Sequence, residues 1–511
     1  QKVVLAEPGP LKEPKEWRYI GKYVPNVDAK VKSLGQAEFG LDFAVPDMVI
    51  AVVERCPTFG GRVKSFNEDE VKKQAGVIDV FQMSSGVALV CEKYWQALKA
   101  RETLKVEWSF GKNQSLSSQK ILDRYKKMMD QTTGNTMVES GDVDDALQRA
   151  DKVVEAEYEL PYLAHSTMEP MNATAFVQKN KVDVWSPNQI PTLLRNQTAK
   201  LTGMDRNNVH IHTSKFLGGG FGRRSATDYT LEAVEISKKL KKPVKVIWSR
   251  EDDTRFSPLR PLSLHRLKAT LKDNKLVSWK HQLGCESIMQ YVLPDWFPAM
   301  MPGWVPGFID KAAGGVMGWY MEITGNAPVT GEGAHVPYNI ENFKLSHYAQ
   351  DLDIPIHFWR SVGHSYNGFV VESFFDEVAH NLGKDPYELR KELLPTGSRH
   401  RGVLDLAVQK SGWQGTTPEN RYRGLACHKS FNTYVAQVAE VEIIENRVQV
   451  KKVTCAVDCG IPINPEIIAK QMRSGIIYGL SAALNGEITL ERGGVVQANF
   501  DTYEPLRISQ T

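Results

Sequence analysis

A glycine-rich stretch near the middle of the chain, Phe216-Leu-Gly-Gly-Gly-Phe-Gly-Arg-Arg224, constrains its fold and function most. Within it, four of the five residues 218–222 are glycines, so backbone N–H groups can approach a ligand closely. A β-like run, 209–213, precedes the stretch, and a helical pattern of apolar residues from Tyr229 to Leu240 follows it. A strand, a glycine turn and a helix in this order predict a site for an oxygen-rich, anionic ligand.

The stretch differs from two common nucleotide-binding loops. No Gly-Lys-Ser/Thr closes a phosphate-binding P-loop, and Arg223 stands where the dinucleotide fingerprint requires glycine. A tight turn between closely packed backbones is the structural alternative to a ligand site. The rest of the chain has to decide between the two.

Composition narrows the class of protein. With 511 residues, 42% of them apolar and 24% charged, we expect a globular protein of more than one domain. The net charge of +3 comes from interspersed basic and acidic residues, so it does not favour a nucleic-acid partner. The six cysteines lack the close spacing of an iron–sulfur or disulfide framework. The sequence begins with Gln1 and not with an initiator Met, so we expect a processed or partial chain.

Local patterns predict a mixed α and β fold. Residues 1–15 resemble an exposed linker. Residues 290–330 are expected to form an irregular segment that could line a substrate pocket, and Asp385 is expected to cap the N-terminus of a helix. Strands are expected at 19–24, 39–43, 48–53, 105–108, 153–160, 173–179, 182–186, 209–213, 243–248 and 448–457. Helices are expected at 95–104, 118–130, 193–201, 229–240 and 370–382.

Several residues have the right chemistry for a site, and each has an ordinary structural explanation. His210 and His212 share one strand face as a metal pair would, although surface histidines explain them better. Ser365 lies in a near match to a nucleophile elbow, which keeps a hydrolase hypothesis open. Glu169 precedes a strand and is more typical of a solvated or capping carboxylate. Arg360 could bind an anion or form an ordinary ion pair within the protein.

Six blocks of sequence occur in a specific order along nearly the whole chain. They are Ile20-Gly-Lys22 with Asp28-Ala-Lys30 and Gly35-Gln-Ala37; Tyr162–Ala173; Leu217–Arg224; Trp359–Ser365; Val371–Glu377; and Ala456–Gly460 with Asn464-Pro465. This order resembles the molybdenum-binding subunits of the xanthine dehydrogenase and aldehyde oxidase family, of the isoquinoline 1-oxidoreductase beta-subunit type. The resemblance implies an α+β fold with a hammerhead-like domain at 16–115. A molybdopterin-binding region of two α/β subdomains would follow, at 135–400 and at 401–511, incomplete at the C-terminus.

The resemblance also implies a molybdenum–pyranopterin cofactor, with or without a cytosine dinucleotide. The metal is held by the dithiolene of the pterin, so no direct protein ligand is expected. The matching cofactor-binding positions are Gln189, Gly219, Gly220, Phe221, Gly222, Arg360, Asp458, Gly460 and Gln471. Ser225 stands where several relatives carry a substrate-contacting acid, so that mode of substrate binding is not expected here.

The implied reaction is hydroxylation of a small molecule, an N-heterocycle or an aldehyde, with water as oxygen source. Electrons would pass to iron–sulfur clusters on a 2Fe-2S small subunit, with a cytochrome c as a candidate acceptor. The family's catalytic glutamate lies in a Gly-x-Gly-Glu stretch that this chain lacks, and Glu504 has no such glycines before it. The catalytic residue is therefore unassigned.

Two further expectations come from the resemblance. An N-terminal part of the molybdenum subunit would be missing, and relatives with a twin-arginine export signal suggest the periplasm, with the cytoplasm as the alternative. A non-catalytic cofactor-binding or assembly module is the second functional hypothesis, because the catalytic glutamate is absent from these residues.

Overall fold

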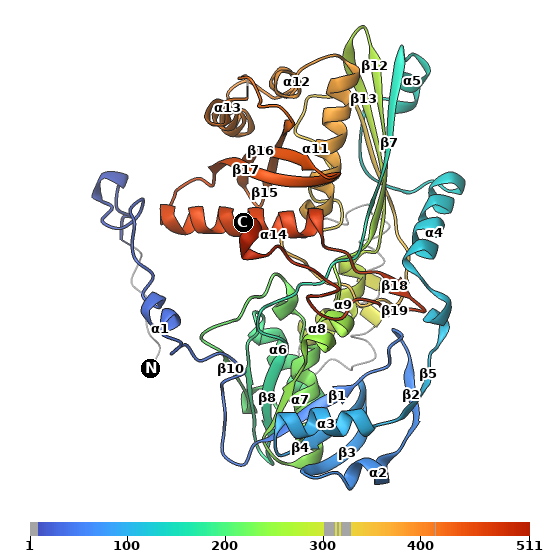
Figure 1. Cartoon of the computed structure of the whole chain (residues 1–511), viewed down its shortest axis with the longest axis vertical. Helices are drawn as coiled ribbons and strands as arrows, with labels where there is room; N and C mark the ends of the chain where they lie inside the picture. Colours follow the sequence, from blue (N-terminus) through green and yellow to red (C-terminus); the bar gives the residue numbers. More distant parts are fainter. Residues whose placement is uncertain (1–8, 301–311, 314–315, 318–328, 414) are drawn as a thin grey trace. The chain divides into compact units, whose positions relative to one another are not determined.

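The computed structural model describes residues 9–300, 312–313, 316–317, 329–413 and 415–511. The chain divides into two compact units. The larger unit comprises Glu38–Pro395 and Ser481–Pro505, and the smaller unit comprises Gln1–Ala37, Thr396–Leu480 and Leu506–Thr511. Figure 1 shows the elements of both.

A seven-stranded mixed sheet forms one core of the larger unit. Its order is β10 (Val209–Thr213), β9 (Val182–Ser186), β8 (Asn172–Val177), β11 (Val244–Ile247), β1 (Val49–Glu54), β4 (Gly86–Cys91) and β3 (Val77–Met83). The β9–β10 and β1–β11 pairs are parallel, and the other neighbours are antiparallel. The sheet therefore combines strands from the expected 16–115 and 135–400 ranges.

Helices cover both faces of this sheet. Helices α6 (Pro191–Thr202) and α7 (Asp228–Leu240) pack on one face, and α2 (Glu68–Lys72) and α3 (Tyr94–Thr103) pack on the other. Every residue of β4 is buried, as expected of an apolar strand with both faces covered. The α7 residues Tyr229, Ala233 and Ile236 are fully buried, which confirms the helical period predicted after the glycine stretch.

A five-stranded sheet forms the second core of the larger unit. Its order is β6 (Asn135–Ser140), β14 (Asn342–Tyr348), β13 (Lys275–Cys285), β12 (Ser263–Lys272) and β7 (Lys152–Leu160). Helices α4 (Ser118–Gln131), α5 (Val143–Gln148) and α11 (His364–Asn381) contact it. Trp279 of β13 packs edge-on against Phe374 of α11, with ring centroids 4.9 Å apart.

Short elements complete the larger unit. They are the β2–β5 ribbon (Arg62–Phe66 with Val106–Ser109), the β18–β19 ribbon (Leu490–Glu491 with Gly494–Val495), α8 (Arg250–Phe256), α9 (Ile288–Met300) and α12 (Pro386–Leu393). Asp385 caps α12 through its side chain, which accepts hydrogen bonds from the N–H groups of Tyr387 and Glu388, as the sequence predicted.

The smaller unit is built on an antiparallel three-stranded sheet of β15 (Arg421–Ser430), β16 (Thr433–Ile444) and β17 (Arg447–Asp458). Helix α13 (Arg399–Ser411) packs on one face of this sheet. Buried residues alternate along the strands on that face, as period-two geometry requires: Leu425, Cys427, Ala436, Val438 and Ala456. Helices α1 (Ala29–Ser33) and α14 (Pro465–Leu484) complete the unit.

Three expectations from the sequence are wrong. Residues 19–24 contain a turn at Gly21, whose φ is +81°, instead of a strand. Residues 39–43 are not a strand, because their backbone groups bond to side chains: Leu41 N–H donates to Glu169, and Lys245 donates to the carbonyls of Leu41 and Phe43. The first part of 290–330 is helical within α9, and most of the remainder lies outside the described residues.

Candidate functional site

The glycine loop lies between β10 and α7 in the larger unit and is held at close range by other segments. A Cβ atom on Gly222 would lie 1.8 Å from the carbonyl oxygen of Phe358, and Gly222 has φ +107°. A Cβ atom on Gly218 would lie 2.2 Å from Cβ of Glu169. These two positions require glycine for packing within the protein itself.

Gly220 differs from these two glycines. A Cβ atom there would have the Gln189 side-chain oxygen as its nearest neighbour, at 3.5 Å, which is ordinary contact. The backbone of Gly220 is also outside the left-handed region. Nothing in the described part of the protein requires glycine at this position, so the reason for glycine here is not packing within the protein itself.

Three loops of the larger unit contain residues in left-handed backbone conformations. They occur at Ser166, at Gly219, Phe221 and Gly222, and at Ser361 and Val362. Such conformations cost free energy for residues with side chains, and most for a β-branched valine. The three loops are the ones that carry three of the sequence blocks: Tyr162–Ala173, Leu217–Arg224 and Trp359–Ser365.

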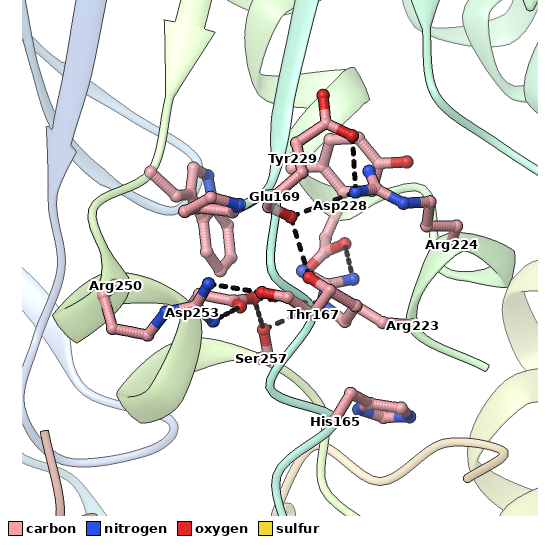
Figure 2. A network of polar contacts seen from close by, with 12 residues as sticks. His165, Thr167, Glu169, Arg223, Arg224, Asp228, Tyr229, Arg250, Asp253 and Ser257 are labelled. Atoms are coloured by element: carbon pink, nitrogen blue, oxygen red, sulfur yellow. Dashed lines mark hydrogen bonds and ion pairs between the residues drawn. The ribbon is translucent and has the colours of Figure 1, made fainter. Parts of the chain in front are cut away.

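The two arginines after the glycines hold the loop and do not themselves face a ligand. Arg223 is fully buried and makes two hydrogen bonds of 2.8 Å to the carboxylate of Asp228. It also donates to Ser257, which donates to Asp253, and Asp253 pairs with Arg250 (Figure 2). Arg224 is equally buried and pairs with Glu169 at 2.9 Å. Neither guanidinium is therefore left for an anion, and the predicted anion site would depend on backbone groups.

Those backbone groups fit an acceptor-rich cofactor. Within the described part of the chain, the N–H groups of Gly219, Gly220 and Gly222 donate to no protein acceptor. The side-chain amide of Gln189, also without a hydrogen bond among the described residues, lies beside Gly220. Oxo and phosphate groups and the polar rim of a pterin accept hydrogen bonds, so this donor set suits them.

Two neutral histidines line the contact between the glycine loop and the segment before Arg360. Nε2 of His165 donates to the Phe358 carbonyl at 2.8 Å, because a carbonyl can only accept. Burial lowers the pKa of His165 to about 4 and that of His357 to about 3. Nδ1 of His357 lies 3.5 Å from the Ser225 hydroxyl, which donates to Gly222 O at 2.6 Å.

The structure thus brings Gln189, the glycine loop and the segment leading to Arg360 together within the larger unit. Arg360 itself is half-buried, and the Ser361 hydroxyl donates to its carbonyl. His165 and the role of Glu169 were not recognised from the sequence. Their only signal was their position within the Tyr162–Ala173 block.

The other predicted positions belong to the smaller unit. Asp458 ends β17, and its carboxylate accepts from the Gly460 N–H at 3.0 Å and from Arg399 at 2.6 and 2.7 Å. The Arg399 guanidinium lowers the pKa of Asp458 to about 2. Gly460 has φ +79°, and Gln471 is exposed on α14. A cavity of about 570 Å³ adjoins this turn, lined by β17 and α14 residues that include Cys455, Cys459 and Arg473.

The structure explains the alternative site residues. Nε2 of His212 lies 3.1 Å from Asp183, and its ring stacks on Trp185, so it is not part of a histidine metal pair. The Ser365 hydroxyl donates to the Val362 carbonyl in the first turn of α11, which does not favour a nucleophile. In the part of the chain that the structure describes, no group of three metal-ligating side chains occurs. No helix there is long and apolar enough to cross a membrane.

Comparison with known proteins identifies the class to which this fold and site belong. Residues 128–286 and residues 392–511 each match a molybdopterin cofactor-binding domain. The fold is similar to that of quinoline 2-oxidoreductase from Pseudomonas putida 86, with a TM-score of 0.77 and 12% identity over 97% of this chain and 90% of that one.

Two sequence relatives extend over nearly the whole chain. The beta subunit of isoquinoline 1-oxidoreductase from Brevundimonas diminuta is 28% identical over 98% of this chain and 63% of its own length. A protein of Gluconacetobacter polyoxogenes named membrane-bound aldehyde dehydrogenase [pyrroloquinoline-quinone] is 30% identical over 98% of this chain and 67% of its own length. This chain thus spans about two thirds of the length of each relative.

The chain belongs to the molybdenum-binding subunits of the xanthine dehydrogenase and aldehyde oxidase family, of the isoquinoline 1-oxidoreductase beta-subunit type. The mixed α and β fold predicted from the sequence is confirmed. The hammerhead assignment, the domain boundaries and the individual cofactor-binding residues stay predictions.

Proposed function

We propose that this chain is the molybdopterin-binding portion of a molybdenum hydroxylase that oxidises an N-heterocycle or an aldehyde with water as oxygen source. The observation that carries the proposal is the donor set of the glycine loop: the N–H groups of Gly219, Gly220 and Gly222 are without acceptors among the described residues. The names of the two relatives, an isoquinoline oxidoreductase and an aldehyde dehydrogenase, support these two substrate classes.

When bound, a molybdenum–pyranopterin supplies the two-electron redox chemistry and the site of oxygen transfer. The residues of this chain would hold and orient it. The glycine N–H groups and the Gln189 amide would donate to its acceptor atoms, with Phe221 and Arg360 beside them. Asp458, Gly460 and Gln471 are proposed as further contacts, supported by their positions in the sequence blocks.

Metal and pterin analysis of the native complex tests this proposal. We expect molybdenum and a fluorescent pterin oxidation product in near-stoichiometric amounts with the purified protein. Gly220→Asp should remove both while the fold is kept, because the new Cβ meets only ordinary contacts. Gly402→Asp is the matched control, since Gly402 has open space around it on α13. Wild-type protein without molybdenum or pterin would refute the proposal.

A non-catalytic cofactor-binding or assembly module is the second candidate function. It is favoured by the absence of a Gly-x-Gly-Glu stretch from these 511 residues. Assays of the chain with and without the remainder of its natural complex distinguish the two. Substrate oxidation by the complete complex supports the hydroxylase, whereas bound cofactor without turnover in any assembly supports the module.

We further propose a 2Fe-2S small subunit as electron acceptor, a cytochrome c after it, a cytosine dinucleotide form of the cofactor, and the periplasm as location. These proposals are supported only by the family to which the chain belongs. Affinity purification from native cells with iron analysis tests the partners. Nucleotide release on acid hydrolysis tests the cofactor form, and cell fractionation tests the location.

A further inference from the structure

Glu169 is the most heavily hydrogen-bonded residue next to the glycine loop. Its side chain is only 6% exposed, and Figure 2 shows it with its partner Arg224. Each carboxylate oxygen accepts two hydrogen bonds. Oε2 accepts from Gly218 N–H at 2.9 Å and from Arg224 at 2.9 Å. Oε1 accepts from Asn172 at 3.0 Å and from Leu41 N–H at 3.2 Å. All four partners are donors, so only a carboxylate satisfies the site.

The pair of Glu169 with Arg224 connects both ends of the loop. The backbone N–H of Glu169 donates to Gly218 O at 2.9 Å, so Glu169 holds the start of the loop on both sides. Nε of Arg224 donates to Gly219 O at 2.5 Å, and Arg224 Nη2 donates to Glu169 O at 3.0 Å. The Arg224 carbonyl accepts from the Gln189 N–H at 3.0 Å. A single ion pair thus holds the loop and the neighbouring glutamine.

We propose that Glu169 is a positioning residue, whose carboxylate fixes the glycine loop and Gln189 so that their free donors stay directed toward one ligand. The inference rests on the proposed cofactor-binding function of this loop. The Glu169 oxygens bind Gly218 and Arg224, on either side of the three glycines, and the N–H groups of Gly219, Gly220 and Gly222 have no acceptor in the described ranges of the chain. The carboxylate acts through the loop and does not itself contact the ligand.

A purely structural ion pair is the alternative, and the larger unit contains a matched example. Glu372 of α11 pairs with Arg390 of α12 at 3.1 Å, with side chains 5% and 0% exposed. This pair connects two helices and none of the three loops. Glu372→Gln therefore reports what losing a buried carboxylate does to stability alone.

The test compares Glu169→Gln with Glu372→Gln in the native complex. Glutamine keeps the size of the side chain but replaces one carboxylate oxygen with an NH2 group. At position 169 this NH2 group would face the N–H donors that the oxygen now accepts from. We expect Glu169→Gln to lower molybdenum and pterin per folded protein by about 10- to 100-fold, as for residues that orient metal-site ligands. Glu372→Gln should lower the melting temperature and keep the cofactor. Amide hydrogen exchange should rise at 187–190 and 216–224 only in the Glu169 variant.

Glu169→Asp keeps the charge and withdraws the carboxylate by one methylene. It should lose less cofactor than Glu169→Gln, and it carries the test if the glutamine variant does not fold. Wild-type cofactor content and exchange in both foldable Glu169 variants would overturn the inference, as would equal cofactor loss in Glu372→Gln. Wild-type protein without cofactor would refute the proposed function instead, and the exchange data would still decide whether Glu169 holds the loop.

Discussion

The glycine loop of the larger unit and the turn after β17 in the smaller unit use the same local chemistry. In each, a carboxylate accepts from a glycine N–H: Glu169 from Gly218 at 2.9 Å and Asp458 from Gly460 at 3.0 Å. In each, an arginine pairs with that carboxylate, Arg224 at 2.9 Å and Arg399 at 2.6 Å. The difference is burial.

The side chains of Glu169 and Arg224 are 6% and 0% exposed, whereas those of Asp458 and Arg399 are 38% and 41% exposed. Water solvates the exposed pair and weakens its attraction, so either partner can be lost at little cost. The buried pair has no water to replace a lost partner. We therefore expect the loss of a partner to cost more free energy at the buried pair than at the exposed pair.

A third carboxyl, that of Glu286, shows how burial changes the pKa of a carboxyl whose described hydrogen-bond partner is a hydroxyl and not a cation. Glu286 is 4% exposed, and the Tyr162 hydroxyl donates to it at 2.6 Å. Burial raises the pKa of Glu286 to about 8, so the carboxyl is largely protonated at neutral pH. The three carboxyls differ in burial and pairing, and the two turns also differ in the space around their glycines. Four predictions use these differences.

Arg224→Met should give the largest effect, because it leaves the Glu169 carboxylate buried without its cation. We expect the free energy of unfolding of the larger unit to fall by about 3–5 kcal/mol. Urea unfolding followed by tryptophan fluorescence measures it, and Arg399→Met at the exposed pair is the control. Equal losses in the two variants would mean that burial does not separate the two turns.

Gly222→Ala and Gly460→Ala compare the two turns sterically, since both glycines have positive φ. The added Cβ would meet the Phe358 carbonyl at 1.8 Å in the first variant and nothing within 4 Å in the second. We expect losses of about 3 kcal/mol for Gly222→Ala and about 1 kcal/mol for Gly460→Ala. Thermal unfolding of both variants measures these losses. A well-tolerated Gly222→Ala would show that Phe358 does not pack against the loop.

Glu286→Gln tests burial without a cation. A carboxyl whose folded pKa is raised stabilises the fold fully below its unfolded pKa and loses this contribution as pH rises toward about 8. Glutamine stays neutral, so the advantage of the variant over wild type should be almost nothing at pH 4 and should grow by roughly 1.4 kcal/mol per pH unit until pH reaches about 8. Unfolding free energies from pH 4 to 9 provide the measurement, and a pH-independent difference would contradict the protonated carboxyl.

Arg399→Gln should give the smallest effect on stability. The pKa of Asp458 is lowered, so its ion pair stabilises the fold fully at pH values above the ordinary pKa of an aspartate. This contribution is lost as pH falls through about 2. Without Arg399, we expect the pKa of Asp458 to rise toward its ordinary value. Carbon-13 NMR titration of labelled aspartate measures this. An unchanged titration would show that the arginine is not the cause.

Local signals in the sequence were enough for much of the secondary structure. The predicted bounds of β9 and β10 agree with the structure, and those of α6 and α7 agree to within a few residues. Period-two and period-3.6 patterns are local, so they can be recognised without knowing the partners. Residues 39–43 had a strand-like pattern, but Lys245 and Glu169 hold their backbone through side chains far away in the sequence.

Part of the candidate site was likewise predicted from the sequence, and part became clear only from the structure. The glycine loop, Gln189 and Arg360 were recognised because their residue types and order resemble a known family. Glu169 was interpreted as a solvated or capping carboxylate, because it lies in a loop before a strand and the sequence shows no partner for it. Its actual partners lie 3, 49, 55 and 128 residues away along the chain. No local pattern could reveal a contact set of this kind.

The sequence by itself determined the family and the mixed fold, and it predicted an anion-binding glycine loop at 216–224, because each depends on residue type and order. Only the tertiary structure decided that Arg223 and Arg224 pair with the protein's own carboxylates, and that the N–H groups of Gly219, Gly220 and Gly222 have no acceptor among the described residues. The physical reason is that a charge is available to a ligand only after its protein partners are known, and burial decides how firmly those partners are held.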